Sequence, residues 1–394
     1  MKGAGRRVAI TGYGVVAPCG IGKKAFWDGL NGPGITDHRS IEIPDWDPLP
    51  YFDNPKEARR ADRVEQMALA AAAEALEHSG RPNVDSDRIG TIFATGVGGL
   101  RSTEDQIEVM LTKGDRRVSP FLVPMMMPNA AGAAISMRYG FRGPNETITT
   151  ACAASTHAIG YAARMIAWGM CDAVVTGGTE SAGCHVGVVS FGNMTALSTS
   201  GSSMPFDADR DGFVLGEGAA VLVLEDWSAA EARGATIIGE ILGAASNADA
   251  HHITAPAPGG TGAIACMRLA LADAGLEPDA IGHINAHGTS TPLNDAAEAA
   301  AVTEVFGANA VPITSTKGVT GHALGAAGAL EAVAVLLAME NRLIPPTAGT
   351  TNVDPEFSID LVLGAARPWT PAPTISNNFG FGGHNGSIVI GPVA

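Results

Sequence analysis

The sequence predicts an α/β fold made of layers of mixed, largely buried sheets and helices. Short runs rich in β-branched residues alternate with Ala- and Leu-rich stretches of helical length, which is typical of layered α/β proteins. Hydrophobic residues make up 46% of the 394 residues, enough to fill one large core or two fused ones. Because no Pro-, Ser- or charge-rich linker interrupts the middle, we expect two similar halves packed as one body, residues 1–235 and 236–394.

The first half opens with a strand at 7–16 that ends in a Gly-rich turn. The Pro-containing segment 36–55 has no clear periodicity and is predicted to be a loop. The strongest helix, 61–79, is dominated by Ala and Leu and stops at Gly80. Further strands are predicted at 89–95, 147–150, 173–176 and 219–224. Further helices are predicted at 23–30, 102–111, within 119–138 and at 228–233. A helix of small residues is also predicted to begin after Ala151, with Cys152 in its first turn.

The second half echoes this order of elements. In both halves a strand leads into a helix of small residues with a reactive side chain at its start, Cys152 in the first and His322 in the second. The predicted strands of the second half are 237–245, 283–286, 374–377 and 386–390. The predicted helices are 261–274, 294–306 and 323–341.

The charge and the cysteines exclude several classes of protein. With 25 Lys and Arg against 40 Asp and Glu, the net charge of −15 argues against binding nucleic acid or an anionic membrane. Five scattered cysteines without a CxxC pair argue against a disulfide framework and against zinc or another metal. We find no signal-peptide core and no apolar run of about 18 residues that would span a membrane, so we expect a cytoplasmic protein.

Cys152 follows a β-branched run that ends at Ala151, and it lies where a helix of small residues begins. Unpaired N–H groups and the helix dipole at such a position stabilise a thiolate, so we expect a lowered pKa and a nucleophilic sulfur. A small cysteine packed structurally under the helix is the alternative, and the Cys152 segment by itself favours it.

Three further clusters bear on this choice. His287 lies where a buried strand breaks into a turn, a common place for site residues in α/β proteins, although it could simply bond the backbone. Lys317 and Glu331 stand in Gly- and Ala-rich surroundings, where buried charges need a partner, and an ion pair that fixes the helix is one outcome. The Gly-rich turn 377–385 is expected to bring backbone N–H groups close to a ligand beneath its two phenylalanines. A turn of this composition without any function is the alternative.

Together these clusters give the chain a close resemblance to the β-ketoacyl-acyl-carrier-protein synthases, particularly the type II elongating condensing enzymes similar to synthase II. The resemblance covers essentially the whole chain. It rests on Thr150-Ala-Cys-Ala153, Asn285-Ala-His-Gly-Thr-Ser-Thr-Pro292, Lys317-Gly-Val-Thr-Gly-His322, Asn378-Phe-Gly-Phe-Gly-Gly383 and Arg210-Asp-Gly-Phe-Val-Leu-Gly-Glu-Gly218, in order and at suitable spacing. It implies a thiolase-like fold of duplicated, layered α/β/α/β/α halves, with no cofactor.

The resemblance also implies the reaction, in which malonyl-carrier protein loses carbon dioxide and extends a Cys-bound acyl chain by two carbons. Cys152 would carry the acyl chain, while His287 and His322 would stabilise the charge that decarboxylation builds up. Backbone N–H groups of Cys152 and Phe381 would form an oxyanion site. The remaining implied roles are site geometry for Lys317 with the structural Glu331, gating for Phe381, and substrate binding for Thr289, Thr291 and Phe379.

The implied partners are acyl carrier protein, through its phosphopantetheine arm, and a second copy of the chain in a homodimer. An acidic carrier needs a local basic patch, for which the resemblance indicates Lys56, Arg59, Arg60, Arg116 and Arg117, although a solvated charged face would look the same. Met204 stands where relatives often carry Arg, so the footprint of the carrier can differ here. His251 and Asn378 also depart from many relatives.

Three alternatives remain open. A ketosynthase of a polyketide pathway would share every motif and could form a heterodimer with a chain-length subunit. A thiolase acting on coenzyme A would have a second cysteine where this chain has 379–384. A silent chain-length subunit would lack Cys152. Pocket depth, with Val97, Met110 and Met127 as candidates, would set the acyl chain length.

Overall fold

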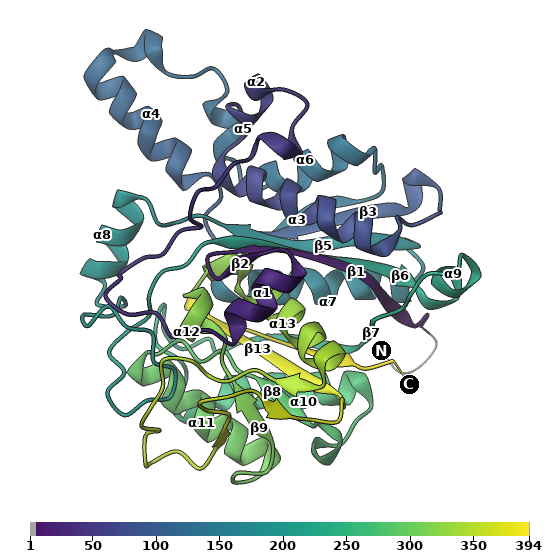
Figure 1. The fold of residues 1–394 in the computed structure, drawn as a ribbon, viewed down its shortest axis with the longest axis vertical. Helices are drawn as coiled ribbons and strands as arrows, with labels where there is room; N and C mark the ends of the chain where they lie inside the picture. The colour runs from purple at the N-terminus through teal and green to yellow at the C-terminus, as the bar shows by residue number, and fades with distance from the viewer. Residues whose placement is uncertain (1–4, 394) are drawn as a thin grey trace.

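The structure, a computed structural model, describes residues 5–393. The strands of the two halves belong to one continuous 12-stranded sheet, whose two halves form separate layers. Helices cover both outer faces and fill the space between these two layers, which are called the two sheets below (Figure 1). This is the predicted α/β layering, and residues 1–4 and 394 at the ends of the two predicted halves lie outside the described residues.

The sheet of the first half has the strand order β1 (Val8–Ala17), β6 (Gly218–Asp226), β5 (Ala173–Glu180), β3 (Ile89–Ala94) and β4 (Asn145–Ile148). β6 is antiparallel to both β1 and β5, whereas β3 is parallel to both β5 and β4. All residues of β1, β3 and β5 are buried, which explains their nearly continuous apolar sequences.

The sheet of the second half repeats this pattern. Its order is β7 (Gly239–Ala248), β14 (His384–Gly391), β13 (Thr374–Gly380), β8 (His283–Asn285) and β9 (Pro312–Thr314), with β11 (Asp360–Leu361) added at the edge. β14 is antiparallel to β7 and β13, and β8 is parallel to β13 and β9, as in the first half. The two sheets join where Ala9 and Ile10 pair with Glu240 and Gly239.

Two central helices, α7 (Ala154–Ala167) and α13 (Ala327–Asn341), lie between the sheets (Figure 1). They pass so closely that a Cβ on Gly328 would lie only 2.1 Å from Oγ1 of Thr156, a distance that only glycine permits. The outer layers contain α3 (Arg63–Ser79) and α6 (Ala130–Tyr139) on one side, and α10 (Thr261–Ala274) and α11 (Pro292–Phe306) on the other.

The expectation that no stretch could span a membrane by length and apolarity is wrong for one helix. Leu324–Asn341 has 18 residues and a mean hydropathy of 1.4, but 89% of that stretch is buried inside the protein. α13 is apolar on all sides because it contacts both sheets, so we interpret it as a core helix.

The remaining elements connect these layers or project from them. α4 and α5 extend from one end of the molecule, close to α2 (Figure 1). These elements are α1 (Lys23–Leu30), α2 (Pro55–Ala58), α4 (Leu100–Lys113), α5 (Leu122–Met126), α8 (His185–Asn193), α9 (Trp227–Ala232), α12 (Lys317–Thr320), β2 (Gly20–Ile21) and the pair β10 (Leu343–Ile344) and β12 (Arg367–Pro368).

Most predicted elements are present, with shifted ends. α3 begins at Arg63 because Asp62 caps it, in a capping box with Glu65. α13 begins at Ala327, four residues later than predicted, because 324–326 form a 3₁₀ turn with Leu324 at φ 41°. The sequence did not indicate α2, α8 or α12, which are all shorter than ten residues.

Candidate active site

Cys152 lies in a 3₁₀ turn, Ala151–Ala153, and not in the first turn of an α-helix as predicted; α7 begins two residues later. Ala151 adopts φ 49°, in the left-handed region, so the chain turns sharply between β4 and α7. Gly380 packs against this turn, and a Cβ there would lie 3.0 Å from the backbone nitrogen of Cys152. The turn that carries Cys152 is therefore held by the Gly- and Phe-containing turn that ends β13.

The predicted lowering of the Cys152 pKa is wrong. Burial raises the pKa of this thiol to about 11, although the backbone N–H of Phe381 and the charge of Lys317 act in the opposite direction. The side chain is only 5% exposed, so desolvation of a thiolate outweighs the favourable groups around it. At neutral pH Cys152 is a thiol with a hydrogen-bonding environment that favours its ionisation.

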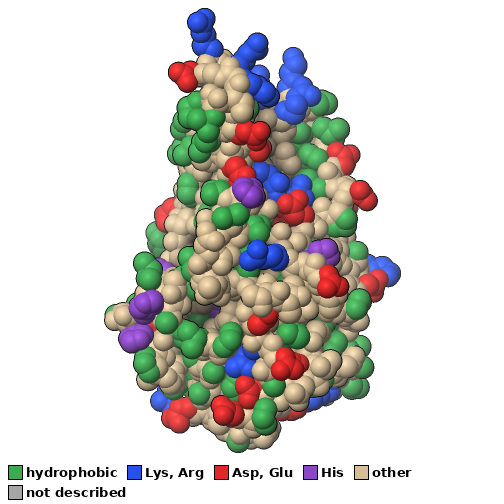
Figure 2. Space-filling view, turned by 90° about the vertical axis from the view of Figure 1, so that its left-hand side faces the viewer, with side chains coloured by type: hydrophobic (Ala, Val, Ile, Leu, Met, Phe, Trp, Pro, Cys, Tyr) green, Lys and Arg blue, Asp and Glu red, His purple; other side chains and the backbone are tan. Residues whose placement is uncertain are grey.

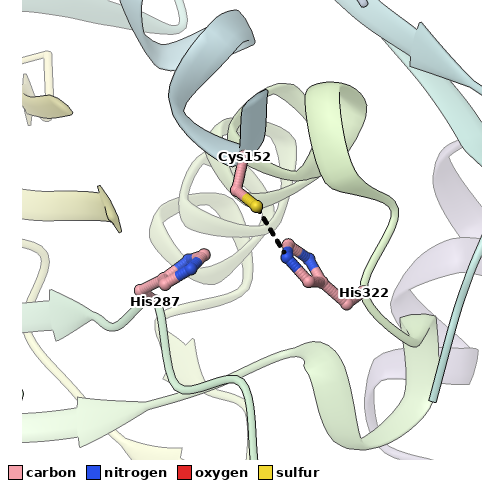
Figure 3. Close-up of side chains that lie close together, drawn as sticks. All are labelled: Cys152, His287 and His322. Atoms are coloured by element: carbon pink, nitrogen blue, oxygen red, sulfur yellow. Dashed lines mark hydrogen bonds between the residues drawn. The ribbon is translucent and has the colours of Figure 1, made fainter. Parts of the chain in front are cut away.

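His322 is the group closest to the sulfur. Its Nε2 atom lies 3.0 Å from Cys152 Sγ, and Figure 3 shows His322 and His287 converging on the sulfur from two sides. Its backbone N–H donates to Val214, and its ring packs edge-on against Phe213, with 5.1 Å between the ring centroids. Burial and the charge of Lys317 hold the pKa of His322 well below its usual range, so the ring is neutral.

His287 follows β8, at the strand end where the sequence predicted it. Its ring centroid lies 5.3 Å from that of His322, at an interplanar angle of 80°. The buried carboxylate of Glu298 accepts the backbone N–H groups of His287 and Gly288, at 2.8 and 2.7 Å, which fixes the turn. Burial and Lys317 also hold the pKa of His287 well below its usual range.

Lys317 and Glu331 form the buried ion pair that the sequence led us to expect. Both side chains are 1% exposed, and the ammonium group of Lys317 also donates to the backbone carbonyl of His287. The pair has no net charge, but its Lys317 ammonium lowers the pKa of Cys152 and of both histidines, while Glu331 lies on α13. Breaking such a pair leaves an uncompensated buried charge.

A cavity of about 400 Å³ opens over these groups. Its lining includes the predicted residues Cys152, His287, His322, Phe379 and Phe381. The two predicted threonines also line it, with Oγ1 of Thr289 and Oγ1 of Thr291 2.8 Å apart. Val97, Met110 and Met127 do not line this cavity and are each 42% exposed in the single chain.

The predicted docking residues lie apart from the cavity, at one end of the molecule. Arg116 and Arg117 are exposed beyond the end of α4. The guanidinium group of Arg60 stacks on the ring of Phe121 at 4.2 Å, which brings the two basic segments together. Figure 2 shows Lys and Arg side chains gathered at this end, and the exposed group also includes Lys56 and Arg59. Met204 is half-buried, and its backbone N–H donates to Ser290. Because its side chain is uncharged, it adds no positive group to this surface.

The ligand atoms of Cys152, His287 and His322 lie within 4.8 Å of one another, a spacing that a soft divalent ion could also accept. The nearby positive charge of Lys317 disfavours a cation at this position. The arrangement suits an electrophilic carbonyl better, because it places one nucleophile and two neutral imidazoles around a single point.

Sequence reasoning left several contributing residues without a role. Phe213, which orients His322, belongs to the run 210–218 that carried part of the resemblance, so its position was a usable signal. Glu298 lies eleven residues after His287 on α11, at a spacing that no motif marks. Asn378 and Thr156 contact each other across the interior, and their proximity comes from the tertiary packing alone.

Comparisons with known proteins agree with this geometry. Family models for the β-ketoacyl synthase N-terminal and C-terminal domains match residues 37–230 and 238–351. The 3-oxoacyl-[acyl-carrier-protein] synthase 2 of Synechocystis sp. is 42% identical over 402 residues, covering 96% of each chain. The chain belongs to the β-ketoacyl synthase family.

Solved structures show the same fold. The ishigamide ketosynthase/chain length factor has a TM-score of 0.93 at 33% identity, over 99% of this chain and 100% of that one. A type II polyketide synthase acyl-carrier protein in complex with its ketosynthase, bound to the hexaketide, has a TM-score of 0.90 at 30% identity, over 99% and 100%. The thiolase-like fold predicted from the resemblance is confirmed.

The predicted reaction is confirmed by these relatives as well. The chain is an acyl-transferring condensing enzyme of the 3-oxoacyl-acyl-carrier-protein synthase type, in fatty acid biosynthesis. The alternative of a polyketide ketosynthase is not better supported, because the full-length curated relatives at 40–42% identity are synthases of this type.

Proposed function

We propose that Cys152 is the acyl-carrying nucleophile and that His287 and His322 promote the decarboxylation of malonyl-carrier protein. The observation that carries this proposal is the convergence of Cys152 Sγ and the two imidazoles, within 4.8 Å of one another, in the lining of the cavity. Both rings are neutral, so each can donate one N–H to a developing oxyanion.

In the first half-reaction Cys152 attacks the thioester carbonyl of an acyl-carrier protein. The new C–S bond forms while the bond to the phosphopantetheine sulfur breaks, and the thiol proton ends on the departing arm. The backbone N–H groups of Cys152 and Phe381 would hold the tetrahedral oxyanion. Their effect in lowering the Cys152 pKa supports this role, because both N–H groups act on negative charge at the sulfur.

In the second half-reaction the malonyl C–C bond breaks and carbon dioxide leaves. The electron pair forms an enolate on the malonyl thioester, and N–H donation from His287 and His322 stabilises its oxygen. The carbanion then attacks the Cys152 thioester, so that a C–C bond forms and the C–S bond breaks. The product is a 3-oxoacyl-carrier protein two carbons longer, and the sulfur regains a proton from the medium.

The other residues have positions that suit supporting roles. Lys317 and Glu331 would fix the charge and geometry behind His287, through the ammonium contact with its backbone carbonyl. Thr289 and Thr291 line the same cavity as polar groups for the pantetheine arm. Phe379 would contact this arm, and Phe381, on the turn that holds Cys152, would gate the acyl pocket.

We propose that the acidic carrier docks on the basic end of the molecule. Because the chain has a net charge of −15, it can attract an acidic carrier only at a surface where positive groups cluster. The exposed side chains that form this surface are Lys56, Arg59, Arg60, Arg116 and Arg117. Met204 contributes no charge to it, which favours a footprint centred on α2 and the end of α4.

We propose a homodimer, with a heterodimer as the second candidate. Large apolar side chains are exposed on and around α4, α5 and α6, where a partner would cover them. They are Val97, Ile107, Met110, Leu111, Val123, Met126, Met127 and Met137. The ketosynthase solved with a chain length factor favours testing the heterodimer. The mass of the purified chain in solution decides: a dimer supports the first candidate, and a monomer supports the second. A cytoplasmic location stays a prediction.

An acylation assay tests the central proposal. The purified chain is incubated with acyl-carrier protein, and peptide mass mapping locates the acyl group. We expect one acyl group on Cys152, and its absence would overturn the proposal. An elongation assay with carrier-bound chains from short to long then measures the chain-length preference.

A further inference from the structure

A buried amide, that of Asn378 at the end of β13, contacts the candidate site from behind. Its Nδ2 atom lies 2.8 Å from Oε2 of Glu331 and 3.3 Å from Nδ1 of His287. Its Oδ1 atom accepts the hydroxyl proton of Thr156, from α7. The side chain is 0% exposed. Its contacts with Thr156 on α7 and Glu331 on α13 connect both central helices to the imidazole of His287.

The orientation of this amide follows from its neighbours. Lys317 donates to the other oxygen of the Glu331 carboxylate, so this carboxylate is an acceptor and must face the NH₂ group of Asn378. The amide oxygen then faces the hydroxyl of Thr156, which donates to it. The second N–H of Asn378 is then left to donate to Nδ1 of His287.

A donor at Nδ1 decides which tautomer His287 adopts. Nδ1 must be unprotonated to accept, so in a neutral ring the proton lies on Nε2. Burial and the charges of Lys317 and His322 keep the ring neutral, and they outweigh the backbone carbonyl of Phe379, which favours the protonated ring. Nε2 then carries the one ring proton, which can be donated to the Phe379 carbonyl or to an oxyanion that replaces it in the cavity that both residues line.

We infer that Asn378 is a positioning residue that holds His287 in the Nε2–H tautomer and so makes it a hydrogen-bond donor during decarboxylation. This inference rests on the proposed role of His287. Asn378 is not among the residues that line the cavity, so it is not placed to touch a substrate bound there. It acts only through the imidazole, by the hydrogen bond at Nδ1.

Packing around Asn378 leaves little freedom for other arrangements. A Cβ on Gly328 would lie 2.6 Å from Oδ1 of Asn378 and 2.1 Å from Oγ1 of Thr156, so the amide is enclosed. If Asn378 only fills space, the N–H that it directs at His287 is dispensable. If Asn378 positions His287, that N–H is required. The isosteric variant Asn378→Asp removes that proton and keeps the shape.

The first test separates the two half-reactions in Asn378→Asp. A carboxyl group beside Glu331 presents an acceptor to His287, which then takes a proton on Nδ1. We expect malonyl decarboxylation to fall about 10²-fold, the usual cost of losing one oxyanion donor. Acylation of Cys152 should stay within about twofold, because none of its groups is altered. Unchanged decarboxylation would overturn the inference.

The second test reads the tautomer directly. In protein labelled with ¹⁵N-histidine, correlation of ring nitrogens with ring C–H protons distinguishes Nε2–H from Nδ1–H, and the spectrum of His287→Gln identifies the signal. We expect Nε2–H in the natural chain, Nδ1–H or a charged ring in Asn378→Asp, and a mixture in Asn378→Ala. If Asn378→Asp does not fold, Asn378→Ala decides, and a pure Nε2–H signal there contradicts the inference.

Two matched variants complete the design. Asn377→Asp places a carboxyl group at the neighbouring position, whose side chain contacts Met267 and Ser387 and not the histidine, and should keep decarboxylation within about threefold. A comparable loss in Asn377→Asp would assign the effect to a buried carboxyl group in β13 and reject the inference. If His287→Gln itself keeps full decarboxylation, the proposed role of His287 fails; if only Asn378→Asp does, only this inference fails.

Discussion

Each half of the molecule leads through a 3₁₀ turn into one of the two central helices, and the two halves put different chemistry at that turn. In the first half β4 leads through the turn Ala151–Ala153 into α7, and in the second half the turn Leu324–Ala326 leads into α13. Both turns begin with a non-glycine residue in the left-handed region, Ala151 at φ 49° and Leu324 at φ 41°. Such residues cost about 1–3 kcal/mol each and are typical of functional sites.

The difference between the two halves lies in charge. The first brings the thiol of Cys152 and the buried Glu180 of β5, whose negative charge also raises the pKa of that thiol, whereas the second brings His322 and the Lys317–Glu331 pair. Burial raises the pKa of Cys152 and Lys317 opposes this effect, so the second half tunes the thiol of the first. The two halves thus share one arrangement of turn and helix, but the thiol and the Lys317 charge that acts on it come from different halves.

The largest expected effect comes from removing Cys152, the proposed nucleophile, from the first half. Cys152→Ala should lower condensation by at least about 10³-fold, because no thioester can form. Decarboxylation of malonyl-carrier protein should persist, since both histidines belong to the second half. Carbon dioxide release and product analysis measure the two steps, and Cys171→Ala is the control. Loss of both steps in Cys152→Ala would contradict the division of labour.

The converse change removes the donors of the second half. His287→Ala and His322→Ala should each lower decarboxylation about 10²–10³-fold, because each removes one N–H from the enolate oxygen. Acylation of Cys152 should change much less in His287→Ala. Single-turnover acylation, followed by intact mass, provides the measurement. Equal losses in both half-reactions would show that the histidines do not act separately from the thiol.

The buried ion pair tests the charge difference by stability. Lys317→Met should lower the free energy of unfolding by about 3–5 kcal/mol, because Glu331 remains as an unpaired buried charge. Denaturant unfolding measures this loss. The double variant Lys317→Met/Glu331→Gln removes the charge and should recover at least half of the stability. No recovery would indicate that the cost comes from packing of the lysine stem.

A pH series sharpens the comparison at the sulfur. Because the pKa of Cys152 is raised to about 11, the thiolate fraction should grow about tenfold per pH unit from pH 7 to 9. Alkylation of Cys152 by iodoacetamide, followed by peptide mass, should rise with the same slope. Lys317→Met should react more slowly at each pH, since it loses a positive charge. A plateau below pH 8 would contradict the raised pKa.

The smallest expected effect concerns the surface. Arg116→Glu/Arg117→Glu should lower kcat/KM for acyl-carrier protein about tenfold at low salt, and less at high salt, because exposed charges act mainly on association. A small pantetheine thioester should react normally with this variant. Arg268→Glu, on α10 in the second half, is the control. An equal loss in both variants would show that the effect comes from the overall charge of the protein and not from the proposed docking surface.

Much of the fold was predictable because its signals are local. Runs of β-branched residues and Ala-rich helices ending in glycine indicated β3, α3 and α10 to within a few residues. The less accurate predictions concern the two 3₁₀ turns Ala151–Ala153 and Leu324–Ala326. Cys152 was placed inside a helix and α13 was started too early, because left-handed residues such as Ala151 and Leu324 carry no sequence mark.

The sequence by itself determined the family, the reaction and the residues that meet at the cavity, because each motif encodes a reactive side chain within a short segment. Only the tertiary structure decided the electrostatics of the site. Helix-start placement predicted a lowered pKa for Cys152, and enclosure between two sheets raised it, since desolvation sums over all neighbours. The same packing brings Asn378 to Glu331 and His287 from distant parts of the chain.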